Sequence, residues 1–245
     1  MSKINAIITG VAGYVPDYVL NNEELSRMVD TNDEWITTRT GIKERRILTE
    51  EGLGTSYMAR KAAKLLMTKT GADPDSIDAV VVATSTPDYP HPSTASIVLG
   101  KLGLKNAFAF DLAAACCGFM YALDVACNMI QSGRHKRIIV IGADKMSAIT
   151  DYRDRATCPL FGDGAGAVML EGTTEEGVGM IDSYHRTEVR DFHSSISRQV
   201  VLYVLLQALQ LIIVCITLTK RDAPSSVTLL QRWVTTVLHF WSAMA

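Results

Sequence analysis

The chain has 245 residues and a formal net charge of −2, and 48% of its residues are hydrophobic. A chain of this length can bury a substantial core in one or two domains. The near-neutral charge, without a basic stripe, argues against a nucleic-acid-binding protein. Five cysteines at irregular spacing form neither paired zinc ligands nor a disulfide framework. We therefore expect reduced thiols in a cytoplasmic protein without a signal peptide.

Short apolar segments alternate with amphipathic ones along residues 1–187, and this alternation predicts a layered α/β fold. Asn21 and Glu24 have capping-box spacing, and Met58, Ala62, Leu65 and Leu66 share one side of a predicted helix. In chain order we expect a buried strand over Asn5–Val11, helices over Asn22–Val29 and Thr55–Thr70, strands over Ala79–Thr84 and Phe108–Asp111, a helix over Cys117–Gln131, and strands over Arg137–Ala143 and Ala165–Leu170.

The character of the sequence changes after Thr187. All 17 glycines of the chain precede this point, and an uncharged apolar run follows over Val200–Leu218. That run is long enough for a membrane helix, although Gln207 and Gln210 argue against one. Shifting the codons of this tail by one base permits a reading that restores the glycines and continues the preceding protein. We therefore interpret residues 188–245 as an out-of-frame tail, produced either by a gene lesion or by a sequencing error.

Cys116 is the candidate nucleophile. It lies in the run Asp111–Phe119, where a short strand leads into a helix. Unpaired N–H groups and the positive end of the helix dipole at such a position favour the thiolate. Small neighbours such as Ala115 and Gly118 leave room for a thioester. Cysteines in apolar helices are more commonly small buried hydrophobes, and Cys117 is interpreted in that way.

Three motifs together resemble those of the β-ketoacyl-acyl-carrier-protein synthase III family, the initiating condensing enzymes of bacterial fatty-acid synthesis. They are Thr31–Ile42, Asp111–Phe119 and Phe161–Ala167. The resemblance covers residues 1–187 almost continuously. It implies that these residues form the N-terminal half of a thiolase-like layered α-β-α-β-α fold, and that residues 188–245 contain no domain of the family.

The resemblance also implies roles for individual residues. Cys116 matches the cysteine that takes the acyl group from acyl-CoA. Trp35 and Arg155 match positions that sandwich the adenine of CoA, and Arg39 matches a position near the CoA phosphates. An indole and a guanidinium both stack on an aromatic base, and a guanidinium suits a phosphate. Without the resemblance, a core aromatic and solvated surface charges would be the simpler explanation.

The glycine-rich segment Gly162–Gly166 could be mistaken for a phosphate-binding loop, but no Lys-Ser/Thr follows it. The resemblance implies instead a tight turn that leads into a strand. The family completes its site with a histidine and an asparagine from the second half of the fold, which stabilise the enolate formed as carbon dioxide leaves. Neither residue can be placed in this sequence, and we expect full condensation to be lost.

The resemblance implies an acyltransferase that loads a short acyl group from acyl-CoA onto Cys116 and condenses it with malonyl-acyl-carrier protein. It implies no metal or bound cofactor, and it implies a homodimer. Two alternatives from other classes stay open. One is a non-catalytic thiolase-like partner protein, and the other is a protein anchored in the membrane by Val200–Leu218. A cysteine hydrolase is a narrower alternative for which no Cys–His pair can be argued.

Overall fold

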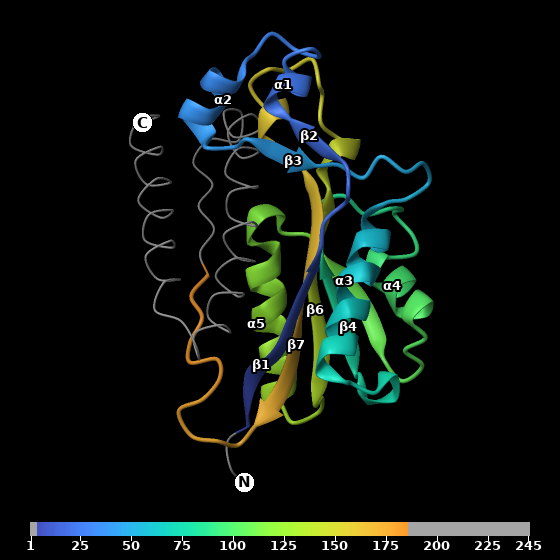
Figure 1. Ribbon diagram of the computed structural model, residues 1–245. Coiled ribbons are helices and arrows are strands. Elements are labelled where there is room, and N and C mark those ends of the chain that lie inside the picture. Colours follow the sequence, from blue (N-terminus) through green and yellow to red (C-terminus); the bar gives the residue numbers. More distant parts are fainter. Residues whose placement is uncertain (1–3, 186–245) are drawn as a thin grey trace.

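The computed structural model describes residues 4–185 of the chain (Figure 1). At its centre is a five-stranded sheet with the strand order β1-β7-β6-β4-β5. β4 runs parallel to β5 and to β6, whereas β7 runs antiparallel to β6 and to β1. The strands span Asn5–Tyr14 (β1), Ala79–Ala83 (β4), Phe108–Leu112 (β5), Arg137–Lys145 (β6) and Asp163–Thr173 (β7).

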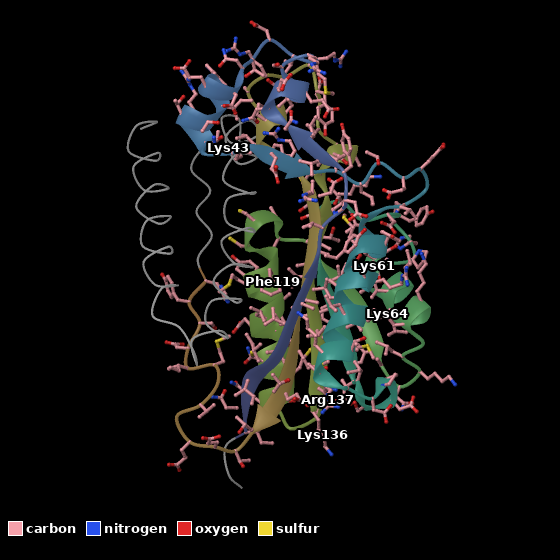
Figure 2. The ribbon with its side chains drawn as sticks, in the orientation of Figure 1. Lys43, Lys61, Lys64, Phe119, Lys136 and Arg137 are labelled. Carbon is pink, nitrogen blue, oxygen red and sulfur yellow. The ribbon has the colours of Figure 1, made fainter. Side chains whose placement is uncertain are left out.

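Helices cover both faces of this sheet. The helices α3 (Thr55–Thr70) and α4 (Thr94–Leu102) lie on one face, and α5 (Gly118–Gln131) lies on the other (Figure 1). Alternate residues of β4 serve the two layers, because Val80 and Val82 pack with α3 and α4 whereas Val81 packs with α5. Figure 2 shows the same separation, with Phe119 on α5 and Lys61 on α3. The predicted layered α/β architecture is confirmed.

A smaller unit, here called the cap, lies over the end of the sheet where β4, β5 and β6 finish (Figure 1). The buried carboxylate of Asp163 joins the cap to the sheet, because it accepts hydrogen bonds from the backbone N–H groups of Leu48 and Ser147, each at 2.8 Å. The cap consists of β2 (Val19–Asn21), α1 (Asn22–Leu25), α2 (Asp33–Thr40), β3 (Glu44–Arg46) with the following residues Ile47 and Leu48, and residues 151–160, whose Cys158 packs with β2, α1 and α2.

All the predicted strands and helices are present, but most of them begin or end at residues other than those predicted. Helix α3 has the predicted bounds and ends at Gly71, whose φ of 65° is left-handed. Helix α1 ends at Leu25 rather than at Val29. The backbone continues as turns from Ser26, whose hydroxyl donates a hydrogen bond to Glu23 O at 2.6 Å. The side chain of Leu65 is 41% exposed, so its predicted place on the buried side of α3 is wrong.

Two predictions about the sheet are also wrong in detail. β1 is an edge strand that pairs only with β7 within the sheet, and it is half-buried rather than buried. It extends through Gly13, because Gly13 pairs with Gly166 of β7. The expected tight turn over Gly162–Gly166 is absent, since β7 already begins at Asp163. Gly162 instead permits close packing, because a Cβ atom there would lie 3.1 Å from the Cβ atom of Arg45.

The predictions for residues 188–245, including the apolar run Val200–Leu218, lie outside the described residues. Within residues 4–185, no helix has both the length and the apolar character that crossing a membrane requires.

Candidate active site

Cys116 lies in the turn between β5 and α5, at the end of the sheet beneath the cap. It forms the middle of a short 3-10 helix, Ala115–Cys117, that leads directly into α5. The preceding residue, Ala115, has a φ of 48°, in the left-handed region. This conformation costs a residue with a Cβ atom roughly 1–2 kcal/mol. Such strain is concentrated at functional sites, where the surrounding fold imposes the conformation.

The start of α5 packs tightly against the sheet. A Cβ atom on Gly118 would lie 3.3 Å from the Cβ atom of Ala83 at the end of β4. A larger residue at position 118 would therefore press against β4. On the other side of the turn, Asp111 of β5 accepts hydrogen bonds from the backbone N–H groups of Thr94 and Ala95, each at 2.7 Å. The turn that carries Cys116 is thus held by β4, β5 and the first turn of α4.

The protonation of Cys116 differs from the sequence-based expectation. Burial is the largest influence and raises the pKa of the Cys116 thiol, and the neighbouring Cys117 raises this pKa further through its charge and a hydrogen bond. Backbone N–H groups at Cys116 and Cys117 lower the pKa, as expected at the start of a helix, but by less. The expected preference for the thiolate is therefore wrong for the free protein.

Apolar residues pack against the side chain of Cys116. Cys116 is half-buried and packs against a small cluster of Met146, Leu160 and Phe161. Ile42, the residue after the C-cap glycine of α2, packs against the same cluster. An apolar surface of this kind limits the access of water to a thioester formed on the sulfur.

Trp35, Arg39 and Arg155 come together in the cap and are here called the Trp35 cluster. The guanidinium carbons of Arg39 and Arg155 lie 4.6 Å and 4.9 Å from the centroid of the Trp35 ring. Arg39 also donates to the backbone carbonyl of Trp35 at 3.4 Å. The cation–π contact of Arg155 joins α2 to a segment far away in the sequence, whereas Arg39 lies on α2 itself. The structure thus brings together the three residues predicted to bind CoA.

The Trp35 cluster is closed against an adenine in this conformation. A base stacked between Trp35 and Arg155 needs about 7 Å between the two planes, because each aromatic contact takes about 3.5 Å. The observed 4.9 Å separation leaves no such space. The side chain of Arg155 is held there by an ion pair with Asp30, which is 97% exposed, at 3.3 Å. Exposed ion pairs of this kind are weak.

Ile42 lies between the Trp35 cluster and Cys116. Trp35 and Ile42 pack against one buried cluster that includes Ile36 and Cys158, and Ile42 also packs against the cluster that contacts Cys116. A single residue of the Thr31–Ile42 motif therefore lies between the two groups of predicted site residues. The Trp35 cluster of the cap and Cys116 of the sheet therefore lie along one continuous apolar region.

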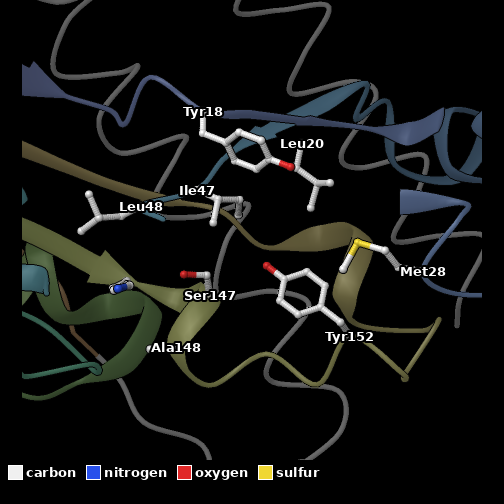
Figure 3. A pocket seen from close by; sticks show the side chains of 9 residues that line it. Tyr18, Leu20, Met28, Ile47, Leu48, Ser147, Ala148 and Tyr152 are labelled. Carbon is white, nitrogen blue, oxygen red and sulfur yellow. The ribbon is translucent and has the colours of Figure 1, made fainter. Parts of the chain in front are cut away.

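A separate cavity of about 370 Å³ opens beside this region (Figure 3). Tyr18 and Tyr152 face each other across it, with Met28 at one side and Ser147 at its base. Tyr152 also packs against the buried cluster of Ile36 and Cys158 against which Trp35 packs. Cys116 is not among the residues that line this cavity. Within residues 4–185, no cluster of three or more His, Cys, Asp or Glu side chains could hold a metal ion.

Sequence reasoning missed Ala115, Asp163 and Arg45. Arg45 is 5% exposed and binds three oxygen atoms of neutral groups in the cap. The sequence has no local signal for it, because Glu44, Arg45 and Arg46 are all charged and only the structure shows that the middle residue of β3 is buried. The positive φ of Ala115 has no such signal, because alanine ordinarily avoids this region.

Comparison with known proteins places this geometry in a family. The family described as 3-oxoacyl-[acyl-carrier-protein] synthase III matches residues 110–188, a range that includes Cys116 and Arg155. A curated β-ketoacyl-[acyl-carrier-protein] synthase III from Phocaeicola vulgatus is 72% identical over 188 residues, which are 77% of this chain and 56% of the relative. A second from Bacteroides thetaiotaomicron is 70% identical over the same shares of both chains.

Solved structures agree with these relatives. The 3-oxoacyl-[acyl-carrier-protein] synthase III of Aquifex aeolicus superposes with a TM-score of 0.67 at 49% identity, covering 70% of this chain and 55% of that chain. The corresponding Thermus thermophilus enzyme superposes with the same TM-score at 44% identity, covering 71% and 53%. This chain thus spans about half the length of the curated relatives it matches.

The covered α/β sheet with its strained cysteine turn thus has the thiolase-like fold of the matched part of these solved structures. Over the part that is matched, the chain is similar to the β-ketoacyl-acyl-carrier-protein synthase III family.

Proposed function

We propose that Cys116 takes a short acyl group from acyl-CoA, the first half-reaction of a β-ketoacyl-acyl-carrier-protein synthase III. The observation that carries this proposal is the position of Cys116 after the strained Ala115, linked through Ile42 to the Trp35 cluster. The cluster offers an indole and two guanidinium groups, which suit the base and phosphates of CoA.

The transfer requires no redox partner. The sulfur of Cys116 attacks the carbonyl carbon of the acyl thioester as its proton leaves, and a new carbon–sulfur bond forms. The bond to the CoA sulfur breaks, and the departing CoA thiolate takes up a proton. One thioester replaces another, so the step needs neither metal nor cofactor. The raised pKa of Cys116 means that proton removal is part of the cost of this step.

In the intact family, a second half-reaction condenses the acyl group with malonyl-acyl-carrier protein, and we propose that this chain does not complete it, because the family's histidine and asparagine cannot be placed in this sequence. In that half-reaction, loss of carbon dioxide leaves a carbanion that attacks the cysteine thioester, which releases the cysteine and forms the β-ketoacyl product. We propose acyl-CoA and malonyl-acyl-carrier protein as partners, a homodimer as the assembly and the cytoplasm as the location. Similarity to synthases III over 77% of this chain supports these assignments.

Loading is tested with the full chain and radiolabelled acetyl-CoA. We expect stable label on the native protein, none on Cys116→Ala and unchanged label on Cys158→Ala, whose buried thiol lies in the cluster beneath Trp35. Label that persists on Cys116→Ala would assign the chemistry to another residue. Absence of label on the native protein between pH 7 and pH 10 would contradict the proposal.

A non-catalytic thiolase-like partner protein is the second candidate. The raised pKa of Cys116 favours it, because a protonated thiol is a poor nucleophile. This candidate predicts specific association with an intact synthase and no labelling by acyl-CoA at any pH.

We further propose that residues 1–187 form a thiolase-like N-terminal domain and that residues 188–245 are an out-of-frame tail. The confinement of all 17 glycines to the first part supports this division. Resequencing the gene around the codons for Arg186 to Val189 tests it. An intact frame there, together with a tail peptide found by mass spectrometry, would contradict a sequencing error.

A further inference from the structure

Arg45 is a buried cation at the centre of the cap. Its guanidinium donates to Leu20 O at 3.0 Å, to Asn22 Oδ1 at 2.8 Å and to Pro159 O at 3.0 Å, and its Nε atom has no hydrogen-bond partner. Burial lowers the pKa of Arg45. Burying a charge against neutral oxygens is unfavourable, so an apolar side chain would fill this volume at lower cost. The guanidinium therefore needs an explanation other than stability.

The three bonds of Arg45 join segments that are far apart in the chain. Leu20 belongs to β2 and Asn22 begins α1, whereas Pro159 lies 114 residues away from Arg45, in the short 3-10 helix Cys158–Leu160. A planar guanidinium fixes both distance and direction between its partners, which a flexible ammonium does not. Arg45 thus ties the Cys158–Leu160 segment to the rest of the cap.

Asn22 extends this connection to the helix that carries Trp35. Its Nδ2 atom donates to Asp33 Oδ1 and to Ile42 O, each at 2.8 Å. Asp33 is the first residue of α2, and Ile42 follows Gly41, the C-cap residue of this helix. The helix is therefore held at both ends by one side chain, whose Oδ1 atom accepts from Arg45.

The segment on the other side of Arg45 carries Arg155. Asp154 closes a tight turn there, since its carbonyl accepts from Cys158 N at 3.0 Å and its carboxylate accepts from Thr157 Oγ1 at 2.6 Å. Fixing Pro159 consequently fixes the main chain at Arg155. Arg45 and Asn22 form an unbroken set of hydrogen bonds between the backbones that bear Arg155 and Trp35.

We infer that Arg45 and Asn22 are positioning residues that set the separation between Trp35 and Arg155, and through it the affinity for the adenine end of acyl-CoA. The inference rests on the proposed function. Because the main chains are held, a base can enter only when the side chain of Arg155 leaves Trp35 and its exposed partner Asp30. Arg45 itself contacts neither the nucleotide nor the acyl group.

The experiment compares two acyl donors in the full chain. Acetyl-CoA carries the adenine, whereas S-acetyl-N-acetylcysteamine presents the same thioester without it. Arg45→Met keeps an aliphatic side chain and removes the guanidinium. We expect it to raise the half-saturating concentration of acetyl-CoA on the order of tenfold, because small displacements of binding groups have large effects. The maximal loading rate and loading by the adenine-free donor should stay unchanged.

Arg46→Met is the matched control. Arg46 is the next residue of β3, is partly exposed, and bonds only to the carbonyls of Pro16 and Asp17 near its ion pair with Glu44. It should behave as the native protein with both donors. Equal losses with both donors in Arg45→Met, or unchanged saturation by acetyl-CoA, would overturn the inference.

A second variant keeps the test decisive if Arg45→Met fails to fold, which circular dichroism would show. Asp33→Ala removes the surface end of the same network, where Asp33 accepts from Asn22. It should shift acetyl-CoA saturation in the same direction and spare the adenine-free donor, and the absence of this shift would overturn the inference. If the native protein is loaded by neither donor, it is the proposed function that fails.

Discussion

Cys116 lies next to Cys117 at the centre of the candidate site, and the pKa of the Cys116 thiol is raised. Cys116 is half-buried, and the largest cause of its raised pKa is burial, followed by the charge of Cys117 and a hydrogen bond between the two side chains. Because the thiolate is the nucleophile, a raised pKa reduces the reactive fraction at neutral pH. The sequence places a second acid next to the nucleophile, and the structure shows that this acid opposes activation.

The raised pKa of Cys116 predicts the pH dependence of loading. Below the pKa of Cys116, the loading rate should rise about tenfold for each pH unit, because the thiolate fraction does so. Cys117→Ala removes two of the influences that raise this pKa, so its profile should shift to lower pH and its rate at pH 7 should increase. Radiolabelling by acetyl-CoA from pH 6 to pH 10 measures both profiles.

Cys127→Ala provides the control for that experiment. Cys127 is 2% exposed on α5, and burial raises its pKa to about 11, but it packs with the sheet rather than with Cys116. Its replacement should leave the loading profile in place. Identical profiles for the native protein and Cys117→Ala would contradict the coupling between the two thiols.

The element that presents the nucleophile is a strand, a strained turn and a helix. The strand and the helix on either side of the turn could be predicted from the sequence. The apolar strand Phe108–Leu112 and the periodic helix Gly118–Gln131 are both local patterns. The left-handed conformation of Ala115 could not, since β4, β5 and α5 impose it together. The same holds for Arg45, whose bond to Pro159 spans 114 residues. Local patterns predict elements, whereas the site depends on contacts between them.

The strain at Ala115 gives a measurable difference between neighbouring alanines. Replacement by glycine in a regular conformation costs roughly 0.5–1 kcal/mol through the entropy of the unfolded chain. At Ala115, with φ 48°, glycine also relieves about 1 kcal/mol of left-handed strain, whereas Ala114 has φ −143° and offers no such relief. Ala115→Gly should therefore be less destabilising than Ala114→Gly by about 1 kcal/mol.

Urea unfolding of both variants, followed by circular dichroism, gives the two free energies of unfolding. A larger loss in Ala115→Gly than in Ala114→Gly would contradict strain at the turn. The loading rate should fall in Ala115→Gly even though its stability is retained, because a more flexible turn holds the Cys116 sulfur less firmly.

At the scale of the whole molecule, activity requires the cap to keep a fixed place on the sheet. The carboxylate of Asp163 accepts hydrogen bonds from the backbone N–H groups of Leu48, in the cap, and of Ser147, which follows β6. Beside it, Gly162 lets β3 approach, since a Cβ atom there would lie 3.1 Å from both the Cβ atom of Arg45 and the carbonyl oxygen of Arg46. The Trp35 cluster belongs to the cap and Cys116 belongs to the sheet, so their separation is set at this junction.

Gly162→Ala tests this junction, and Gly164→Ala is its matched control. Neither glycine has a positive φ, and a Cβ atom on Gly164 would meet its nearest neighbours at 3.6 Å, an ordinary contact. Gly162→Ala should lower the free energy of unfolding by about 1–3 kcal/mol through overpacking. Gly164→Ala should be neutral or stabilise by about 0.4–1 kcal/mol. Because Arg45 is displaced only in the first variant, saturation by acetyl-CoA should weaken in Gly162→Ala alone. Equal stability and equal saturation of the two variants would show that the cap does not depend on this contact.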